Sequence, residues 1–418
     1  MSFRFGKTVM TTAVLSVLLV ILSACGDDPT PAPAAKAPAA KAAPAAKAPA
    51  AKPAAPKKEA PKKEAPKAKA KPTATPKPSF DAEKYFKGQT IRLMVGFGQG
   101  GGTDAQARFF GANWGKFIPG KPRIIVSNLT PVEAERNYVW NSKPDGLTLA
   151  VEATPGIFDE FATTAQFKQD EVTWIGATSG KDQFWVLWGE FAKKAGYKCI
   201  DSAFNGTGAK ITIADSVPSP LDMTSTSFMS AMLADYFNLP FEIKSVATTG
   251  TTSQLLMLER GDINSWTSST VWHQMPIRRP GWSGDGTIKP FADMSFPGYT
   301  IGANSEADFD CPQVTTFMSE AQQKEWGTFA GLRSVVSKNI IGPPKINPDV
   351  TAALRKALDD AMKDKDFAAG LTKFAGIPNN YTPGDTLQGQ MEELVQGFRA
   401  QRTEYDALRT KYYGKYVN

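Results

Sequence analysis

The chain of 418 residues has very little of two side chains on which many metal and nucleophilic sites depend, because it contains only three cysteines and one histidine. The cysteines do not show the short spacing of zinc ligands, and His273 has no second histidine and no serine or cysteine nucleophile motif near it. We therefore expect no metal, no cofactor and no enzymatic activity, and we interpret His273 as a structural residue.

The few cysteines allow one possible disulfide in the folded part of the chain. Beyond Cys25, the chain has only the even pair Cys199 and Cys311. In an oxidising compartment these two residues can form a disulfide, and two separate buried thiols are the alternative.

Long hydrophobic runs are also scarce, and the clearest one lies at the N-terminus. Arg4 and Lys7 precede an apolar run over residues 9–22, which is the plan of a secretory signal and is too short for a confident membrane span. Leu22-Ser23-Ala24-Cys25 then resembles a bacterial lipobox. We predict a lipoprotein signal peptide over residues 1–24 and a lipid anchor on Cys25, with an ordinary signal peptide and an incidental cysteine as the alternative.

The segment that follows lacks almost every residue that builds a core. Residues 29–78 are nearly all alanine, proline and lysine, so we predict a disordered, extended tether over residues 25–80 that spaces a folded domain from a membrane. Contact of its lysines with peptidoglycan is the alternative role. Residues 29–80 hold 12 lysines and 2 glutamates against a net charge of +7 for the whole chain, so residues 81–418 are mildly acidic. Nucleic-acid binding therefore loses its main support.

The remaining 338 residues are too many for one ordinary core and suit two lobes. Short strand patterns alternate with helical ones, which predicts an α/β fold with helices on the sheets. The expected strands cover residues 90–95, 123–126, 147–151, 172–177, 184–188, 210–214 and 242–247. Helices are expected over residues 105–117, from the capping pair Asn347-Pro348 through residue 362, and over residues 386–413.

A glycine cluster joins the first expected strand to the first expected helix, with the sequence Gly96-Phe97-Gly98-Gln99-Gly100-Gly101-Gly102-Thr103-Asp104. Glycines allow close approach of a ligand, and the N–H groups and dipole of the following helix favour an anion. A dinucleotide fits the glycine spacing, but no acidic residue follows the second strand. The lysine of a nucleoside-triphosphate loop is absent as well. A purely structural glycine turn stays open.

Residues 97–104 and the motif Pro144-Asp145-Gly146-Leu147-Thr148-Leu149 together resemble the solute-binding proteins of tripartite tricarboxylate transporters, also called Bug receptors. The similarity extends through residues 214–220, Gly250, residues 261–263 and the helix over residues 347–362, which covers nearly everything after the tether. The resemblance implies two α/β lobes, each a mixed sheet flanked by helices, with a ligand cleft between them. It places lobe 1 at residues 81–187 plus 296–418 and lobe 2 at residues 188–295.

The resemblance also implies a ligand site built from both lobes. The predicted ligand-binding residues are Phe97, Gly100, Gly101, Thr103, Asp104, Thr154, Ser219, Thr249 and Thr251. We expect the Asp104 carboxylate to face backbone N–H groups or a helix start, and direct binding of a neutral solute is the alternative. Three segments depart from the family pattern, namely residues 128–131, 216–220 and 248–252, so the ligand is not transferred from the family.

The resulting hypothesis is an extracytoplasmic solute-binding lipoprotein. It would capture a small organic carboxylate for membrane transporter subunits, as a monomer anchored to a bacterial membrane in the periplasm or on the cell surface. The alternatives are a ligand-sensing receptor for a signalling partner and an envelope-spacing lipoprotein without a ligand. Five tryptophans in the middle of the chain, where the second lobe and the hinge are expected, are candidates for stacking on an aromatic solute, although most are expected in the core, namely Trp185, Trp188, Trp266, Trp272 and Trp282.

Overall fold

A computed structural model describes residues 80–416, except for 158, 162–163, 179–182, 215–225, 245, 247, 249, 270–271, 296–302, 336 and 376–380. All described residues belong to one compact unit, Thr75–Asn418. The predicted signal peptide, Cys25 and nearly the whole tether lie outside the described residues, and so do Ser219 and Thr249.

The larger sheet has six strands in the order β11-β4-β10-β3-β1-β2. Their bounds are β1 Thr90–Val95, β2 Arg123–Asn128, β3 Thr148–Glu152, β4 Thr173–Ala177, β10 Asn339–Gly342 and β11 Thr382–Pro383. β1 runs parallel to β2 and β3, whereas β10 is antiparallel to both β3 and β4. The sheet is therefore mixed, and the carboxyl ends of β1, β2 and β3 lie at one edge, where ligands commonly bind in such sheets.

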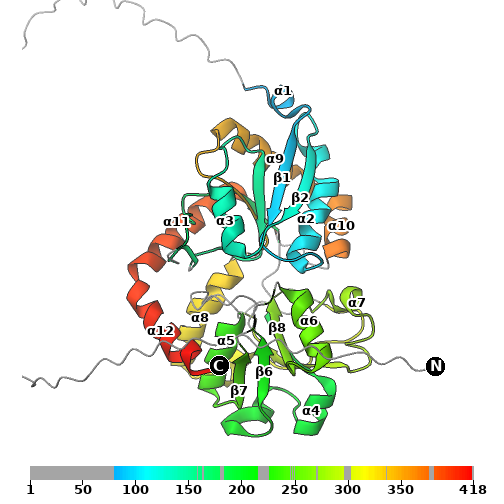
Figure 1. The fold of residues 1–418 in the computed structure, drawn as a ribbon, viewed down its shortest axis with the longest axis vertical. Coiled ribbons are helices and arrows are strands. Elements are labelled where there is room, and N and C mark those ends of the chain that lie inside the picture. The colour runs from blue at the N-terminus through cyan, green and yellow to red at the C-terminus, as the bar shows by residue number, and fades with distance from the viewer. Residues whose placement is uncertain are drawn as a thin grey trace, which may run out of the picture. The chain divides into compact units, whose positions relative to one another are not determined.

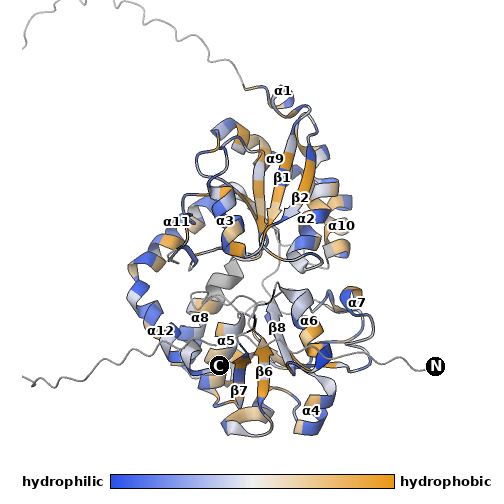
Figure 2. Cartoon of the chain, in the orientation of Figure 1, coloured by the Kyte–Doolittle hydropathy of each residue, from blue (hydrophilic) through white to orange (hydrophobic). Residues whose placement is uncertain are grey.

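Helices cover both faces of this sheet (Figure 1). Successive side chains of a strand point to opposite faces, so Leu93 and Met94 of β1 belong to different apolar clusters. Leu93 packs with α2 (Gly102–Asn113), α9 (Pro348–Lys363) and α10 (Lys365–Ala375). Met94 belongs to the cluster that contains residues of α3 (Val132–Trp140) and α11 (Gly384–Ala400). Figure 2 shows the hydrophobic residues concentrated on the strands between these helices.

Two smaller sheets lie in the middle of the chain. β5 (Gln183–Trp188) is antiparallel to β8 (Ser265–Ser269) and β9 (Ile288–Asp293), and β6 (Ile211–Ala214) is parallel to β7 (Phe241–Lys244). The Asn264 side chain joins the two sheets, because its Oδ1 accepts the Thr212 N–H at 2.8 Å. These sheets carry α4 (Gly189–Ala195), α5 (Thr226–Tyr236), α6 (Thr251–Arg260) and α7 (Met275–Arg278). We call the six-stranded sheet and its helices the first lobe, and these two sheets and their helices the second lobe.

The remaining helices are α1 (Ala82–Phe86), α8 (Glu320–Val335) and α12 (Arg402–Tyr416). Both α8 and α12 pack on α5 of the second lobe. The C-terminal part of the chain thus contributes to both lobes, whereas the sequence assigned all of residues 296–418 to the first. β5 begins at residue 183 and pairs with β8 and β9 of the second lobe, so the chain passes from the first lobe to the second before residue 183. The predicted boundary lies at residue 187.

All seven expected strands are present, with bounds within a few residues of the prediction. The predicted cap of α9 is confirmed, since the Asn347 side chain accepts the Asp349 N–H at 2.8 Å and Pro348 occupies the first turn. The single helix expected over residues 386–413 is wrong. Gln401 leaves the helical conformation, because α11 packs on β4 of the first lobe and α12 on β7 of the second.

Cys199 and Cys311 form a disulfide with their sulfur atoms 2.04 Å apart. It connects the residue before the 3-10 segment Ile200–Gly206 to the loop that follows β9. Three of the five tryptophans, Trp185, Trp266 and Trp272, are almost fully buried, so they are core residues. Trp188 and Trp282 pack edge to face, with ring centroids 5.4 Å apart. Among the described helices, none has the length and apolar character of a membrane span.

Candidate ligand-binding site

The glycine loop between β1 and α2 is shaped by two positions that exclude larger residues. A Cβ on Gly96 would lie 2.7 Å from the Val132 Cα, so the start of α3 packs directly against the loop backbone. Gly100 has a φ of +77°, which glycine adopts without strain. The loop therefore depends on glycine for close packing and for its turn, before any ligand is considered.

Asp104 is buried in the first turn of α2 and organises the loop. Its Oδ2 accepts the Gly100 N–H and the Arg108 Nε–H, both at 2.9 Å. Its Oδ1 accepts the Asn128 amide at 2.9 Å. Burial alone would raise the pKa of Asp104, but these three donors reverse that effect and hold the pKa below its usual value of 3.8. The expectation that this carboxylate faces backbone N–H groups agrees with the Gly100 contact.

Asn128 begins residues 128–131, the first of the three segments that depart from the family pattern, and the structure explains what the asparagine does. Its amide nitrogen also donates to the Phe97 carbonyl at 2.8 Å, and its oxygen accepts from Arg108 Nη2 at 3.1 Å. Asn128 thus connects the ends of β1 and β2 to Asp104. Asn128, which departs from the family pattern, thus supports the conformation of the glycine loop.

A second helix, α6, begins beside the glycine loop in space. α6 starts at Thr251 after Gly250, whose φ is +119°. A Cβ on Gly250 would lie 3.5 Å from the Phe97 ring, and one on Gly100 would lie 3.6 Å from the Thr252 hydroxyl oxygen. Neither α2 nor α6 has a side-chain hydrogen bond at its N-cap. Two helix N-termini, one from each lobe, therefore meet at this loop with their first-turn N–H groups, which favours an anion.

Lys338, just before β10, is a site residue that the sequence analysis missed. It is 5% exposed, and its Nζ donates to the Thr103 hydroxyl at 2.8 Å. Its carbonyl accepts the Thr178 N–H at 3.3 Å, and the Thr178 hydroxyl in turn accepts a hydrogen bond from Gln106 of α2. Thr103, Lys338, Thr178 and Gln106 form a chain of hydrogen-bonded, buried polar residues at the start of α2. No local pattern marks Lys338, which is 235 residues from Thr103.

Arg278, the last residue of α7, was missed for the same reason. Its Nη1 donates to the Gly100 carbonyl at 2.6 Å, and its Nε donates to Gln274 Oε1 at 2.8 Å. Burial and the neighbouring Arg279 lower the pKa of Arg278 to about 10, and Asp104 acts in the opposite direction. The second lobe thus places a guanidinium on the glycine loop of the first.

Thr154, predicted at the end of the third strand, is part of the same edge of the sheet. The preceding residue, Ala153, accepts the Lys338 N–H at 3.2 Å through its carbonyl. The Thr154 carbonyl accepts from Arg136 Nη2 at 2.8 Å. Thr154 therefore directly follows the residue whose carbonyl accepts the Lys338 N–H. Arg136 of α3 fixes the position of the Thr154 backbone.

The structure brings most of the predicted ligand-binding residues together. Phe97, Gly100, Gly101, Thr103 and Asp104 share the loop and first turn of α2, and Thr251 lies in the turn of α6 that touches it. Ser219 and Thr249 lie outside the described residues, so nothing is said of their place. The role of all these residues as ligand contacts stays a prediction.

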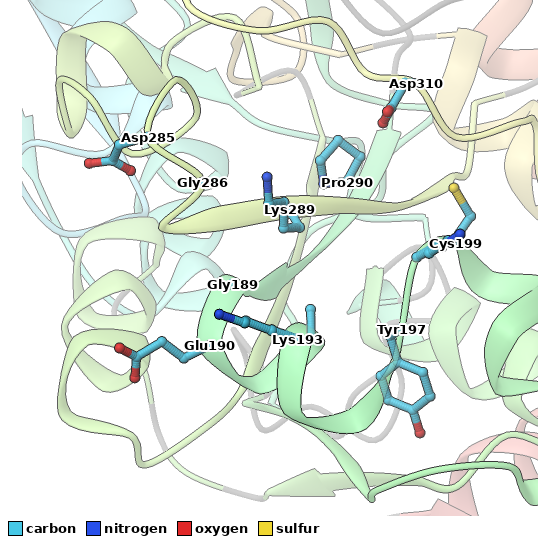
Figure 3. Close-up of a pocket in the computed structure, with 12 residues that line it drawn as sticks. Gly189, Glu190, Lys193, Tyr197, Cys199, Asp285, Gly286, Lys289, Pro290 and Asp310 are labelled. Atoms are coloured by element: carbon cyan, nitrogen blue, oxygen red, sulfur yellow. The ribbon is translucent and has the colours of Figure 1, made fainter.

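A separate pocket of about 550 Å³ opens beside α4 and the disulfide (Figure 3). Charged side chains of both signs line it, namely Lys193, Lys198, Lys289, Glu190, Asp285 and Asp310. Of the predicted ligand-binding residues that the structure describes, none lines this pocket. Within the described ranges, no group of three or more histidine, cysteine or acidic side chains could hold a metal ion.

Several solved structures share this fold, although no family model and no curated protein matches the sequence. The periplasmic binding protein BugD is 15% identical, with a TM-score of 0.56 over 79% of this chain and 99% of its own. MatC from Rhodopseudomonas palustris with bound malate is 18% identical, with a TM-score of 0.52 over 77% of this chain and 99% of its own.

A second R. palustris protein, solved with adipate, is 15% identical, with a TM-score of 0.53 over 78% of this chain and 97% of its own. The TM-scores above 0.5 establish a common fold. The described part of the chain therefore has the two-lobed α/β fold of the periplasmic binding proteins to which BugD and MatC belong.

Proposed function

We propose that this protein is an extracytoplasmic solute-binding protein that captures a small organic acid, with a carboxylate held at the glycine loop. The observation that carries the proposal is the meeting of two helix N-termini, from α2 and α6, at one loop. Oriented N–H groups and helix dipoles stabilise a carboxylate without a covalent step. The malate and adipate in two structures of the same fold support the choice of ligand class.

In the proposed mechanism, the ligand contacts both lobes only when they are closed around it. Binding then shifts the equilibrium toward the closed state, and a membrane transporter recognises that state. The protein acts without catalysis, as a monomer. Its signal peptide exports it, and lipidated Cys25 and the tether over residues 25–80 hold it at a bacterial membrane. The lysine- and proline-rich composition of the tether supports the spacing role.

A thermal-shift screen of the full-length protein in detergent tests the ligand class. The panel contains dicarboxylates, tricarboxylates, aromatic acids, amino acids and uncharged compounds of similar size. A ligand present at about 100 times its dissociation constant adds roughly 2.7 kcal/mol to the free energy of unfolding and raises Tm by several degrees. We expect the shift for carboxylates. A shift with uncharged compounds alone contradicts the proposed ligand.

The variant Gly101→Ala connects such a shift to the loop. The nearest atom to an added Cβ is the Gly98 carbonyl oxygen at 3.5 Å, which is ordinary contact, so the folded protein accommodates the methyl group. The methyl group would occupy the side on which a carboxylate approaches the first turn of α2. We expect the ligand-induced shift to fall by at least half with Tm of the unliganded protein unchanged. Gly389→Ala on α11, where a Cβ meets nothing within 4 Å, is the matched control.

A further inference from the structure

The segment between β3 and β4 is bound by two arginines from different helices. The first is Arg136 of α3, which is 4% exposed. It donates to the Glu152 carboxylate and to the Thr154 carbonyl, both at 2.8 Å, and its Nη1 contacts Asp159. A Cβ on Gly156 would lie 2.6 Å from the Arg136 Cζ, so the backbone of the segment packs directly on the guanidinium. Arg136 therefore fixes the start of the segment.

The second arginine is Arg399, near the end of α11. Its Nε and Nη2 donate to Glu160 at 2.8 and 3.2 Å, and its Nη1 and Nη2 donate to Asp170 at 2.6 and 2.7 Å. The Glu160 side chain is 3% exposed, whereas that of Arg399 is 33% exposed. Paired donors of this kind fix the geometry of a carboxylate as well as its charge. Arg399 thus holds the same segment at two further places.

The two arginines meet in one short turn. Asp159 contacts Arg136, and the next residue, Glu160, binds Arg399. The Glu160 N–H donates to the Gly156 carbonyl at 3.1 Å, which closes the turn. A displacement of Glu160 would therefore move the backbone that lies against Arg136.

Gln169 supplies a second connection between the arginines. Its backbone N–H donates to Glu160 at 2.9 Å, and its side-chain amide donates to Glu152 at 3.1 Å. Gln169 is fully buried, so water does not compete with these hydrogen bonds. We call this set the arginine network, and it consists of Arg136, Glu152, Asp159, Glu160, Gln169 and Arg399.

The arginine network reaches the connection between the lobes. Arg399 lies just before Gln401, where α11 ends and α12 follows. α11 packs on β4 of the first lobe, whereas α12 packs on α5 and β7 of the second. The residue before Arg399, Phe398, packs on Tyr405 of α12 with ring centroids 4.6 Å apart. The segment that contains Thr154 is thus tied to the helix that leads into the second lobe.

We propose that Arg399 is a positioning residue of the ligand site, which fixes the backbone at Thr154 through Glu160 and Arg136. This inference rests on the proposed function and on the predicted role of Thr154, and it deepens both by naming what holds that contact in place. Arg399 itself does not touch the ligand. Its removal leaves two acids without their cation and allows the turn over residues 156–160 to move, so the ligand loses a preorganised contact.

Calorimetric titration of the full-length protein, well below the Tm of every variant, tests the inference. A panel of dicarboxylates, tricarboxylates, aromatic acids and amino acids, including malate and adipate, first identifies the acid that the wild type binds most tightly. Arg399→Gln should weaken this acid about 3- to 10-fold, within the range of coupling between distant residues. Arg399→Lys should give a smaller loss, because lysine keeps the charge but lacks the fork that spans both acids.

Lys356→Gln is the matched control. Lys356 pairs with Asp360 on the surface of α9, so this variant loses the same charge without touching the arginine network. Its affinity should stay within twofold of the wild type.

Hydrogen exchange of the unliganded protein connects the loss of affinity to the segment. The backbone amides of residues 153–157 should exchange faster in Arg399→Gln than in the wild type, because the turn that holds them opens more often. The same amides should exchange at the wild-type rate in Lys356→Gln.

The outcomes separate this inference from the proposed function. If the wild type binds an acid and Arg399→Gln binds it as tightly, the inference is wrong and the proposed function stands. A lower Tm of Arg399→Gln with unchanged affinity would assign the arginine network to stability alone. Weaker binding without faster exchange of residues 153–157, or an equal loss in Lys356→Gln, would also overturn the inference. If the wild type binds no acid of the panel, both are wrong.

Discussion

Two clusters of charged residues lie near the carboxyl ends of β1 and β3, and they stabilise buried carboxylates in different ways. In the Asp104 cluster, one carboxylate receives three donors, from Gly100, Arg108 and Asn128. The Arg108 side chain is 43% exposed, so part of this cluster remains in water. The Asp104 cluster is local, since two of its donors lie within four residues of the carboxylate.

In the Arg136 cluster, one buried guanidinium serves several acids. Arg136 Nε lies 2.8 Å from Glu152, its Nη1 contacts Asp159, and Glu135 is its neighbour on α3. Burial, followed by the charge of Glu152, raises the pKa of Glu135 well above its usual range, and Arg136 opposes the rise. The pKa of Glu135 is therefore raised where that of Asp104 is lowered. The comparison shows that, at one edge of a sheet, hydrogen-bond donors lower the pKa of one buried acid and burial raises the pKa of another.

Replacement of the two arginines gives the largest expected difference between the clusters. Arg136→Met leaves Glu152 and Asp159 without their cation in a region where Arg136 is only 4% exposed, and we expect a loss of about 3–5 kcal/mol in the free energy of unfolding. Arg108→Met should cost about 1 kcal/mol, because Asp104 keeps the Gly100 and Asn128 donors. Urea denaturation measures both. Equal losses would show that burial does not distinguish the clusters.

Asp104→Asn has a smaller effect and tests the charge of the first cluster directly. The amide presents a donor where Gly100, Arg108 and Asn128 also donate, so we expect a loss of about 2 kcal/mol at pH 7. Because the folded-state pKa of Asp104 is lowered, its stabilisation is complete above the usual value of 3.8 and is lost as pH falls through the folded value.

Urea midpoints of wild type and Asp104→Asn should therefore converge as pH falls from 7 to 3. Arg108→Met is a suitable control, because it keeps the titrating carboxylate and should retain an acid-dependent loss. A gap between wild type and Asp104→Asn that stays constant with pH would mean that Asp104 contributes packing rather than charge.

The two clusters also show what the sequence could predict. The glycine loop and the strand before it are read from adjacent residues, and α9 is read from its cap, so each was predicted with bounds close to those observed. The Asp104 carboxylate was expected to face backbone N–H groups or a helix start, because a carboxylate that faces an anionic ligand would repel it. In these cases the interaction partners lie within one turn or one strand.

Arg278 and Lys338 were missed because their partners are far away in the sequence. Arg278 meets Gly100 across 178 residues, and Lys338 meets Thr103 across 235. Lys338 also has a φ of +55°, which no residue type near it would have indicated. An isolated lysine before a short strand is most often solvated, so only the fold reveals that its ammonium is buried at the start of α2.

Glu135→Gln should give the smallest change and the sharpest contrast with Asp104→Asn. Below the usual pKa of 4.5, the raised pKa leaves Glu135 uncharged in both the folded and the unfolded state, so exchange of its carboxyl for a neutral amide should alter the free energy of unfolding by less than about 1 kcal/mol. Above that value, the unfolded wild type ionises at a lower pH than the folded state does, so the wild type loses stability as pH rises toward the folded pKa.

Glu135→Gln removes this loss, and its advantage over the wild type should therefore grow with pH, opposite in sign to the pH dependence of Asp104→Asn. Chemical denaturation of both variants between pH 4 and pH 8 measures the two slopes in one experiment. Parallel curves for wild type and Glu135→Gln would mean that Arg136 keeps Glu135 ionised, and the two clusters would then handle buried acids in the same way. Opposite slopes would establish that Arg136 serves Glu152 and Asp159, with Glu135 held neutral beside them.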